Sequence, residues 1–592
     1  MKKNVLPALR FLISKGGLVA VFALFTALFQ VFLLTRARAF YPVLRILFAF
    51  LVLQLLAAFI RAARQQPLLW LAVLLIVLVR VPFYLHADGA MVTSDNACDG
   101  LQAVELRDTH TAPYFLLGAV KHMGTIKYVL VAFLMDAIGN NYLAYLLIQT
   151  LLFIVVLFTL YEMFKDALSP PALFVFLFLT QFAFIEVIFD FSLSLRGAPY
   201  LEMLFFLVLG AGLIDPEFRA KGRTFLGYYF LFFSIYIHPL GAILVGCFGL
   251  VFLLYSVVRR RFWTNAALAA AGLAAGLYHW FYYLLYLPKP VANGGWEQIG
   301  ILPLDRMTPA YLPEYARILK ESFTGLFNFE FSYMYPYFHD GRAGGSMPAI
   351  NLAAVLVSLA VTAVGVFLAF RTMLRLLRRR QTLQDADWPY LFAGVLTVII
   401  AVKAFLFFPK HVEPRHNFDL AFLIMLSYFI VFSRVIRIGK IRSWKSAVVF
   451  VLAVLAAIPH VATFFQVVRG KDAAYYNILR KLDARGVRYL TTDFILAYPI
   501  YFLSGRKIHV TDSLGPFMVR DFFPAMRIEV DAVPPDQKAY LFMSEEGPNG
   551  PVHKIRTRAI FGETIDNFRR EGILYRTYKF HDYVLIIPRR RG

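Results

Sequence analysis

The chain has 592 residues, of which 59% are hydrophobic, 17% aromatic and 16% charged, and its mean hydropathy is +0.63. This composition is typical of a polytopic membrane protein and excludes an ordinary soluble enzyme. The formal net charge of +23 fits the positive-inside rule better than nucleic-acid binding, since the sequence contains no recognisable nucleic-acid module. The two cysteines, Cys98 and Cys247, predict neither a disulfide framework nor a cysteine metal site.

Apolar segments long enough to cross a bilayer recur along the chain. A hydropathy window of about 19 residues predicts about 13 transmembrane helices. The apolar run around His238 and Pro239 could be one bent helix, but its length favours two short helices that meet there. The predicted spans are 17–34, 43–60, 68–85, 142–161, 171–189, 198–214, 224–237, 240–258, 266–286, 349–370, 389–408, 419–432 and 446–465.

Positive charge alternates between successive loops, as the positive-inside rule requires. One set of loops carries most of the Lys and Arg, for example at 259–261 and 371–380, whereas Arg36 and Arg38 are the main exceptions on the opposite side. We therefore predict a multi-pass protein of the cytoplasmic (inner) membrane with a cytoplasmic N-terminus. A cleavable signal peptide in residues 1–39 is the alternative for the first span, and it gives the same downstream orientation.

The predicted spans divide the chain into three parts. Residues 1–67 are two N-terminal transmembrane helices, and residues 68–466 are a transmembrane domain with long outward loops at 86–141 and 287–348. Residues 467–592 change to mixed polar sequence and predict an extracytoplasmic α/β domain. Its pattern predicts a helix in AYYNILRKLDARG, strands in VRYLTT, KIHVTD and KAYLFMS, and a closing hairpin in GILYRTYKFHDYVLIIP.

The first long outward loop contains GAMVTSDNACDGLQAVELRD, an acidic stretch in a basic chain. A helix that begins near Asp95 places Ala97, Leu101 and Val104 on one face, with Asp95 and Asp99 on the other. We expect a short helix on the outer leaflet, apolar side down, with both carboxylates turned toward a cavity. The alternative is that these acids only complement the helix dipole, and this alternative is favoured for Asp99.

Cationic side chains accompany these acids on the outward side. Lys121 and Lys127 lie near the front of residues 114–139, which we predict to be a second interfacial segment. His238 lies at the outer end of a predicted span, where a histidine is more often a helix-terminus hydrogen bonder than a catalytic group.

A very short outward turn, FFPKHVEPRHNF, holds Lys410, His411, Glu413 and Arg415. His411, His416 and Glu413 suggest zinc, but their spacing matches no strong ligand motif, and a phosphate-binding turn is favoured. The cofactor therefore stays unknown: a divalent metal is possible, but the sequence does not require one.

The order of these parts resembles the GT-C superfamily of integral-membrane glycosyltransferases. That superfamily contains the protein O-mannosyltransferases, the lipid A aminoarabinose transferases and related bacterial transferases that decorate lipopolysaccharide and envelope glycans. The resemblance covers most of residues 68–592, and the relatives often have an Asp-Glu pair where this chain has Asp95 and Asn96. It rests on TSDNACDGLQAVEL, HMGTIKYVLVAFLMDAIGNNYLAYLLIQTLLF, SLSLRGAPYLEMLFFLVLGAGLI and the terminal α/β domain.

The resemblance implies transfer of a sugar from a polyprenyl-phosphate donor to a hydroxyl of an envelope lipid, glycan or protein on the outer face of the membrane. The acceptor hydroxyl needs a general base, for which Asp95 is the first candidate. Asp190, where relatives often carry another functional carboxylate, is the second acid, although it could simply cap the next helix. The leaving phosphate needs cations, and the candidates are Lys121, Lys127, Arg196, Lys410 and Arg415.

Two functions of other classes compete with transfer. A transporter or flippase for polyprenyl-linked glycans would place ionisable groups near the middle of the bilayer, and Arg45, Glu202 and Lys403 do fall inside predicted spans. A non-catalytic envelope scaffold would need no acid at Asp95.

Overall fold

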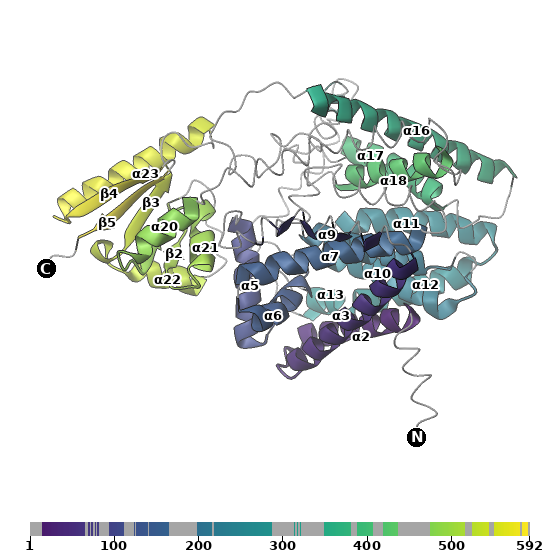
Figure 1. The fold of residues 1–592 in the computed structure, drawn as a ribbon, viewed down its shortest axis with the longest axis horizontal. Helices are drawn as coiled ribbons and strands as arrows, with labels where there is room; N and C mark the ends of the chain where they lie inside the picture. Colours follow the sequence, from purple (N-terminus) through teal and green to yellow (C-terminus); the bar gives the residue numbers. More distant parts are fainter. Residues whose placement is uncertain are drawn as a thin grey trace.

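The computed structural model is a bundle of apolar helices joined to a smaller α/β unit at the C-terminal end (Figure 1). Among the described residues, four helices are long and apolar enough to cross a membrane, and shorter apolar helices accompany them. The protein is therefore a polytopic helical membrane protein. The structure describes residues 15–65, 94–111, 126–139, 141–164, 198–215, 218–238, 240–286, 349–379, 388–406, 418–435, 474–514, 524–543, 550–580 and 583–589, with single positions between 69 and 84 and at 124, 313, 316, 317 and 320.

Most predicted spans that fall on described residues coincide with a helix. The predicted spans 171–189 and 446–465 lie outside the described residues, and half of the positions in 68–85 lie outside them. The matching helices are α2 (Lys15–Thr35), α3 (Phe40–Gln65), α7 (Asn141–Phe164), α9 (Ala198–Leu213), α10 (Lys221–Ile237), α11 (Leu240–Val258), α16 (Ala349–Arg379), α17 (Trp388–Leu406) and α18 (Phe418–Val435).

One predicted span is wrong as a single helix. Residues 266–286 form two helices, α12 (Phe262–Gly276) and α13 (Tyr278–Tyr286), which are separated at Leu277. By contrast, the predicted break near residue 238 is confirmed. His238 is extended (φ −154°, ψ 134°) and ends α10, as expected for a residue that precedes proline.

Glycines bring three helices of the bundle into backbone contact. A Cβ atom on Gly210 of α9 would lie 2.7 Å from the carbonyl oxygen of Gly227 in α10. A Cβ atom on Gly276 of α12 would lie 2.7 Å from the carbonyl oxygen of Tyr229, also in α10. Such close approach is a common basis of helix association in membranes, where burial of apolar surface supplies little driving force. Helix α10 is thus held between α9 and α12.

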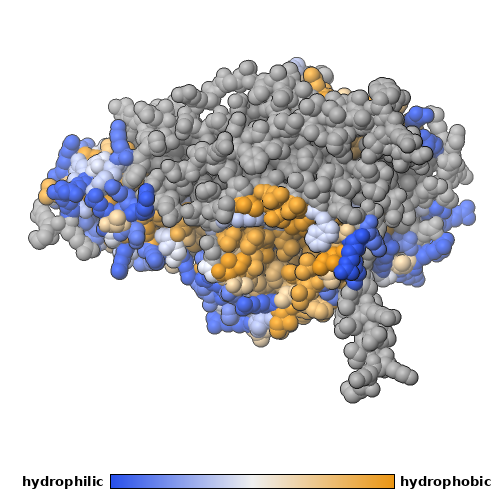
Figure 2. Space-filling model, in the orientation of Figure 1, coloured by the Kyte–Doolittle hydropathy of each residue, from blue (hydrophilic) through white to orange (hydrophobic). Residues whose placement is uncertain are grey.

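The outer helices of the bundle expose apolar side chains. Leu24 of α2 and Ile46, Leu53 and Leu56 of α3 are 49–70% exposed. Figure 2 shows an orange surface over the region of α2 and α3, whereas the C-terminal unit is mostly blue. This contrast separates the lipid-facing part of the molecule from a water-facing part.

The C-terminal unit is built on a five-stranded sheet in the order β2-β1-β3-β5-β4. Strands β1 (Tyr489–Thr491), β2 (His509–Thr511) and β3 (Ala539–Met543) are parallel, and the hairpin β4 (Tyr575–Phe580) and β5 (Tyr583–Pro588) is antiparallel. Each predicted strand and the predicted hairpin coincide with a strand of this sheet. The described helices around it are α20 (Ala474–Asp483), α21 (Phe494–Leu503), α22 (Pro524–Ala532) and α23 (Gly550–Arg570).

The core of this unit continues into the helical bundle. One face of the sheet, with Leu490 and Leu541, packs in a single buried cluster with Ala97, Leu101 and Tyr142 of the bundle side. The other face packs against α23 through a separate cluster. The junction therefore lies where α21 meets helix α5 (Ser94–Thr109), and these two helices lie side by side.

Candidate active site

Helix α5 carries the leading candidate acid in its first turn. It begins at Ser94, so Asp95 is its second residue; the Asp95 side chain lies outside the described part of the structure. Residues 97–104 are buried throughout, with Ala97 fully buried and Leu101 2% exposed. The expected contact of its apolar face with lipid is therefore wrong, because residues 97–104 of α5 are buried within the protein.

The second acid of this helix, Asp99, forms a buried charged pair. Lys127 of α6 (Ile126–Ile138) donates from Nζ to Asp99 Oδ2 at 2.9 Å, and the two side chains are 1% and 7% exposed. The Tyr128 hydroxyl donates to Asp99 Oδ1 at 2.8 Å. Asp99 is thus held in a buried ion pair, and most side chains of α6 are buried in the protein.

Further buried polar groups lie beside this pair. Glu202 of α9 and Tyr145 of α7 are close enough to Asp99 to interact with it electrostatically, and Gln102 follows Asp99 by three residues on α5. In the described part of the structure, both carboxylate oxygens of Glu202, the Tyr145 hydroxyl and both amide atoms of Gln102 lack a hydrogen-bond partner. Atoms of this kind are commonly satisfied by ordered water or by a ligand.

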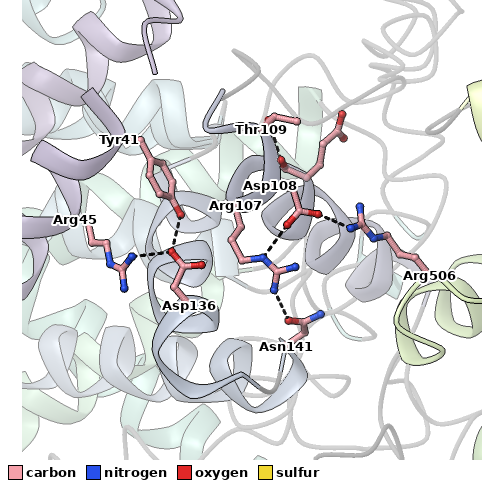
Figure 3. A network of polar contacts seen from close by, with 9 residues as sticks. Tyr41, Arg45, Arg107, Asp108, Thr109, Asp136, Asn141 and Arg506 are labelled. Atoms are coloured by element: carbon pink, nitrogen blue, oxygen red, sulfur yellow. Dashed lines mark hydrogen bonds and ion pairs between the residues drawn. The ribbon is translucent and has the colours of Figure 1, made fainter. Parts of the chain in front are cut away.

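The C-terminal end of α5 is tied to the neighbouring helix and to the C-terminal unit. Arg107 donates to Asp108 at 3.0 Å and to Asn141 at 3.1 Å, and Arg506, just after α21, pairs with the other oxygen of Asp108 (Figure 3). Desolvation raises the pKa of the neighbouring Glu105 carboxyl, while the Arg506 guanidinium opposes that rise. The Asp108–Arg506 pair is partly exposed, so its direct contribution to stability is about 0–1 kcal/mol.

The N-terminal helices reach the same region. Tyr41 and Arg45 of α3 both contact Asp136 near the end of α6, at 3.4 and 3.0 Å (Figure 3). The Tyr41 ring also stacks on His110, directly after α5, with centroids 4.4 Å apart. These contacts bring the α2–α3 turn, α5 and the C-terminal unit, three segments predicted to be outward, to one side of the bundle.

Several predicted site residues lie outside the described part of the chain, and the structure does not test them. His238 is described: it is 6% exposed, and its backbone N–H donates to the carbonyl oxygen of Ser234 at the end of α10. Among the described residues, no group of three metal-ligating side chains is found. The residues outside the description are Lys121, Asp190, Arg196, Lys410, His411, Glu413 and Arg415.

Comparison with known proteins shows a similar fold among the solved structures. No protein-family model matches the chain, and no curated protein matches it. The crystal structure of ArnT from Cupriavidus metallidurans bound to undecaprenyl phosphate matches with a TM-score of 0.52, over 87% of this chain and 97% of that chain. The chain shares the fold of ArnT. The two sequences are 12% identical, so the match shows the fold alone.

The ArnT fold agrees with the polytopic helical membrane architecture expected from the sequence. The sequence interpretation missed Tyr128, Tyr145 and Phe502 as parts of the surroundings of α5. Glu202 did carry a signal, because it is an ionisable residue inside an apolar span. No local sequence pattern predicts the contact of Phe502 with α5, because this contact depends on which helix packs against α21.

Proposed function

We propose that the protein is a glycosyltransferase of the GT-C type. It moves a sugar from a polyprenyl-phosphate donor to a hydroxyl of an envelope lipid, glycan or protein, on the outer face of the cytoplasmic membrane. The observation that carries this proposal is the ArnT fold, which spans 97% of a chain whose structure is bound to undecaprenyl phosphate. The acidic first turn of α5 supports it, because a lipid-borne donor and a water-borne acceptor can meet only at the membrane surface.

Asp95 is the proposed general base. It is the second residue of α5, and the next turns of this helix pack between the bundle and the C-terminal unit. A carboxylate in such a place can accept the proton of an acceptor hydroxyl as the oxygen attacks the sugar carbon. Asp190 is the second candidate acid and the first to test if Asp95 fails.

The leaving polyprenyl phosphate requires cations that face it. Lys127 is engaged by Asp99 at 2.9 Å and is 1% exposed, so it can reach a phosphate only if that pair opens. We therefore propose that the donor phosphate is held mainly by loop cations, while Lys127 fixes α5. The loop cations are Lys121, Arg196, Lys410 and Arg415.

The test is donor cleavage by the purified full-length chain in lipid nanodiscs. Radiolabelled polyprenyl-phosphate sugars are supplied together with envelope extracts as acceptors, and release of free polyprenyl phosphate is measured against empty nanodiscs. A transferase releases polyprenyl phosphate and labels an acceptor. Movement of intact donor across the membrane of proteoliposomes, without cleavage, would instead favour the transporter. If the protein neither cleaves nor moves the donor, the scaffold is favoured.

A further inference from the structure

The C-terminal unit meets helix α5 through an aromatic contact. Phe502, near the end of α21, is 4% exposed, and a Cβ atom built on Gly100 of α5 would lie 2.6 Å from its ring. The ring also meets Tyr142 of α7 edge to face, with centroids 6.5 Å apart. Phe502 thus fills the space that the missing side chain of Gly100 leaves open, one turn and a half from Asp95 along α5.

The turn after α21 adds a second contact with the same helix. Gly505 and Arg506 are both left-handed (φ +62° and +66°), and this turn directs Arg506 to Asp108. A left-handed conformation is unfavourable for an arginine. The ion pair is partly exposed and therefore weak, so the buried aromatic contact is the stronger of the two links.

The ring contact also forms part of a continuous core. Phe502 belongs to the same buried cluster as Leu101 and Val104 of α5 and Leu490 and Leu541 of the sheet. A change in the position of α21 therefore has to move α5, because close-packed interiors transmit displacement rather than absorb it. By contrast, Phe568 of α23 packs on the opposite face of the sheet, in a separate cluster.

We propose that Phe502 is a positioning residue for the transfer reaction: through its contact with Gly100, the C-terminal unit holds α5 in the orientation that Asp95 needs. This proposal rests on the proposed function, since it assigns the C-terminal unit a part in catalysis through Asp95. A displacement of about 1 Å at a reacting group can reduce turnover by up to roughly 100-fold, so the loss of this contact has a measurable effect.

The experiment compares Phe502→Leu and Phe502→Ala with the control Phe568→Leu, a buried phenylalanine of the same unit that does not face α5. Gly100→Ala approaches the contact from the other helix, since its new methyl group must displace the Phe502 ring. Three quantities are measured on full-length protein in nanodiscs: hydrogen exchange of the α5 backbone amides, affinity for undecaprenyl phosphate, and release of polyprenyl phosphate from the labelled donor.

We expect Phe502→Ala and Gly100→Ala to accelerate exchange in α5 by roughly 10-fold or more and to reduce turnover by roughly 10-fold. Affinity for undecaprenyl phosphate should stay within about 2-fold of wild type, because the contact holds α5 and not the donor. Phe502→Leu should recover part of both losses, and Phe568→Leu should leave α5 exchange unchanged.

Wild-type exchange in α5 of a folded Phe502→Ala protein overturns the proposal, and so does faster exchange with unchanged turnover. If Phe502→Ala does not fold, the α5 exchange and the turnover of Phe502→Leu and Gly100→Ala test the proposal instead. A wild-type chain that cleaves no donor, while α5 still responds to Phe502, overturns the catalytic role together with the proposed function. Hydrogen exchange thus separates failure of the contact from failure of the enzyme.

Discussion

The Lys127 ammonium lies 2.9 Å from the Asp99 carboxylate inside the protein, at 1% and 7% side-chain exposure. Each charge makes burial of the other possible, and Tyr128 satisfies the second carboxylate oxygen. Removal of one partner takes away the direct counter-charge of a buried group, which is far more costly than loss of a surface pair. The packing of α5 against α6 therefore depends on both Asp99 and Lys127.

This pair gives a stability prediction. Asp99→Asn should destabilise the protein by about 3–5 kcal/mol, because it removes the carboxylate that pairs directly with the buried Lys127 ammonium. The double variant Asp99→Asn/Lys127→Met should recover a large part of that loss. Thermal unfolding in one detergent measures both, with the surface change Arg569→Ala on α23 as control, since that side chain is 71% exposed. Additive losses in the double variant would show that the two residues do not act as a pair.

A second prediction concerns the proposed base. Asp95→Asn keeps the size of the side chain but removes its ability to accept a proton, so turnover should fall by roughly 10²–10⁴. The unfolding temperature and the affinity for undecaprenyl phosphate should stay close to wild type. The unchanged unfolding temperature distinguishes the Asp95 variant from the Asp99 variant, which we expect to lose stability. Near-normal transfer by folded Asp95→Asn protein would move the assignment to Asp190.

A third prediction concerns the donor phosphate. Arg415→Ala should weaken binding of undecaprenyl phosphate, and Arg415→Lys should restore it only in part, because a point charge does not replace the bidentate guanidinium. The removal of one charged hydrogen bond corresponds to about 1.5–3 kcal/mol, or roughly 10- to 150-fold in affinity. Binding is measured by titration in nanodiscs, with Arg569→Ala as the charge-matched control. Equal affinity in wild type and both Arg415 variants removes this residue from the site.

The fourth prediction concerns topology. The alternation of Lys and Arg between loops predicts that the C-terminal unit lies outside the cytoplasm. A reporter that is active only in the cytoplasm should therefore be silent when fused after Gly592, and a reporter active only outside should give a signal. The control is the same pair of reporters fused after Arg261, in a loop predicted to be cytoplasmic. A cytoplasmic signal at Gly592 contradicts the predicted orientation.

Local patterns were sufficient for much of the fold. The break at His238 could be predicted because proline restricts the residue before it, and the strands could be predicted because β-branched and apolar residues cluster between polar turns. Helix α21, with the sequence FILAYPIYFL, was not predicted. It is apolar almost throughout, because it faces the sheet on one side and α5 on the other, and such a segment shows no helical periodicity.

The candidate site was less accessible to sequence analysis. The position of Asp95 in the first turn follows from local capping signals, and the structure agrees with a helix that starts at Ser94. The burial of Asp99 could not be predicted, because it depends on the partner that Lys127 provides from another helix. The same holds for Gly100 and Phe502, which are 402 positions apart and meet only through the packing of α5 against α21.

The glycine contacts of α10 bear on the order in which the chain assembles. Gly210, Gly227 and Gly276 lie within a short stretch of the sequence, so helices α9, α10 and α12 can associate as soon as α12 has entered the bilayer. Synthesis proceeds from the N-terminus, and the segment that contains Phe502 leaves the ribosome much later. We therefore expect newly made protein to pass through a stage in which the bundle is assembled while α5 still lacks its cover. At that stage α5 is open to proteases and chaperones, and the docking of the C-terminal unit is the step that ends this exposure.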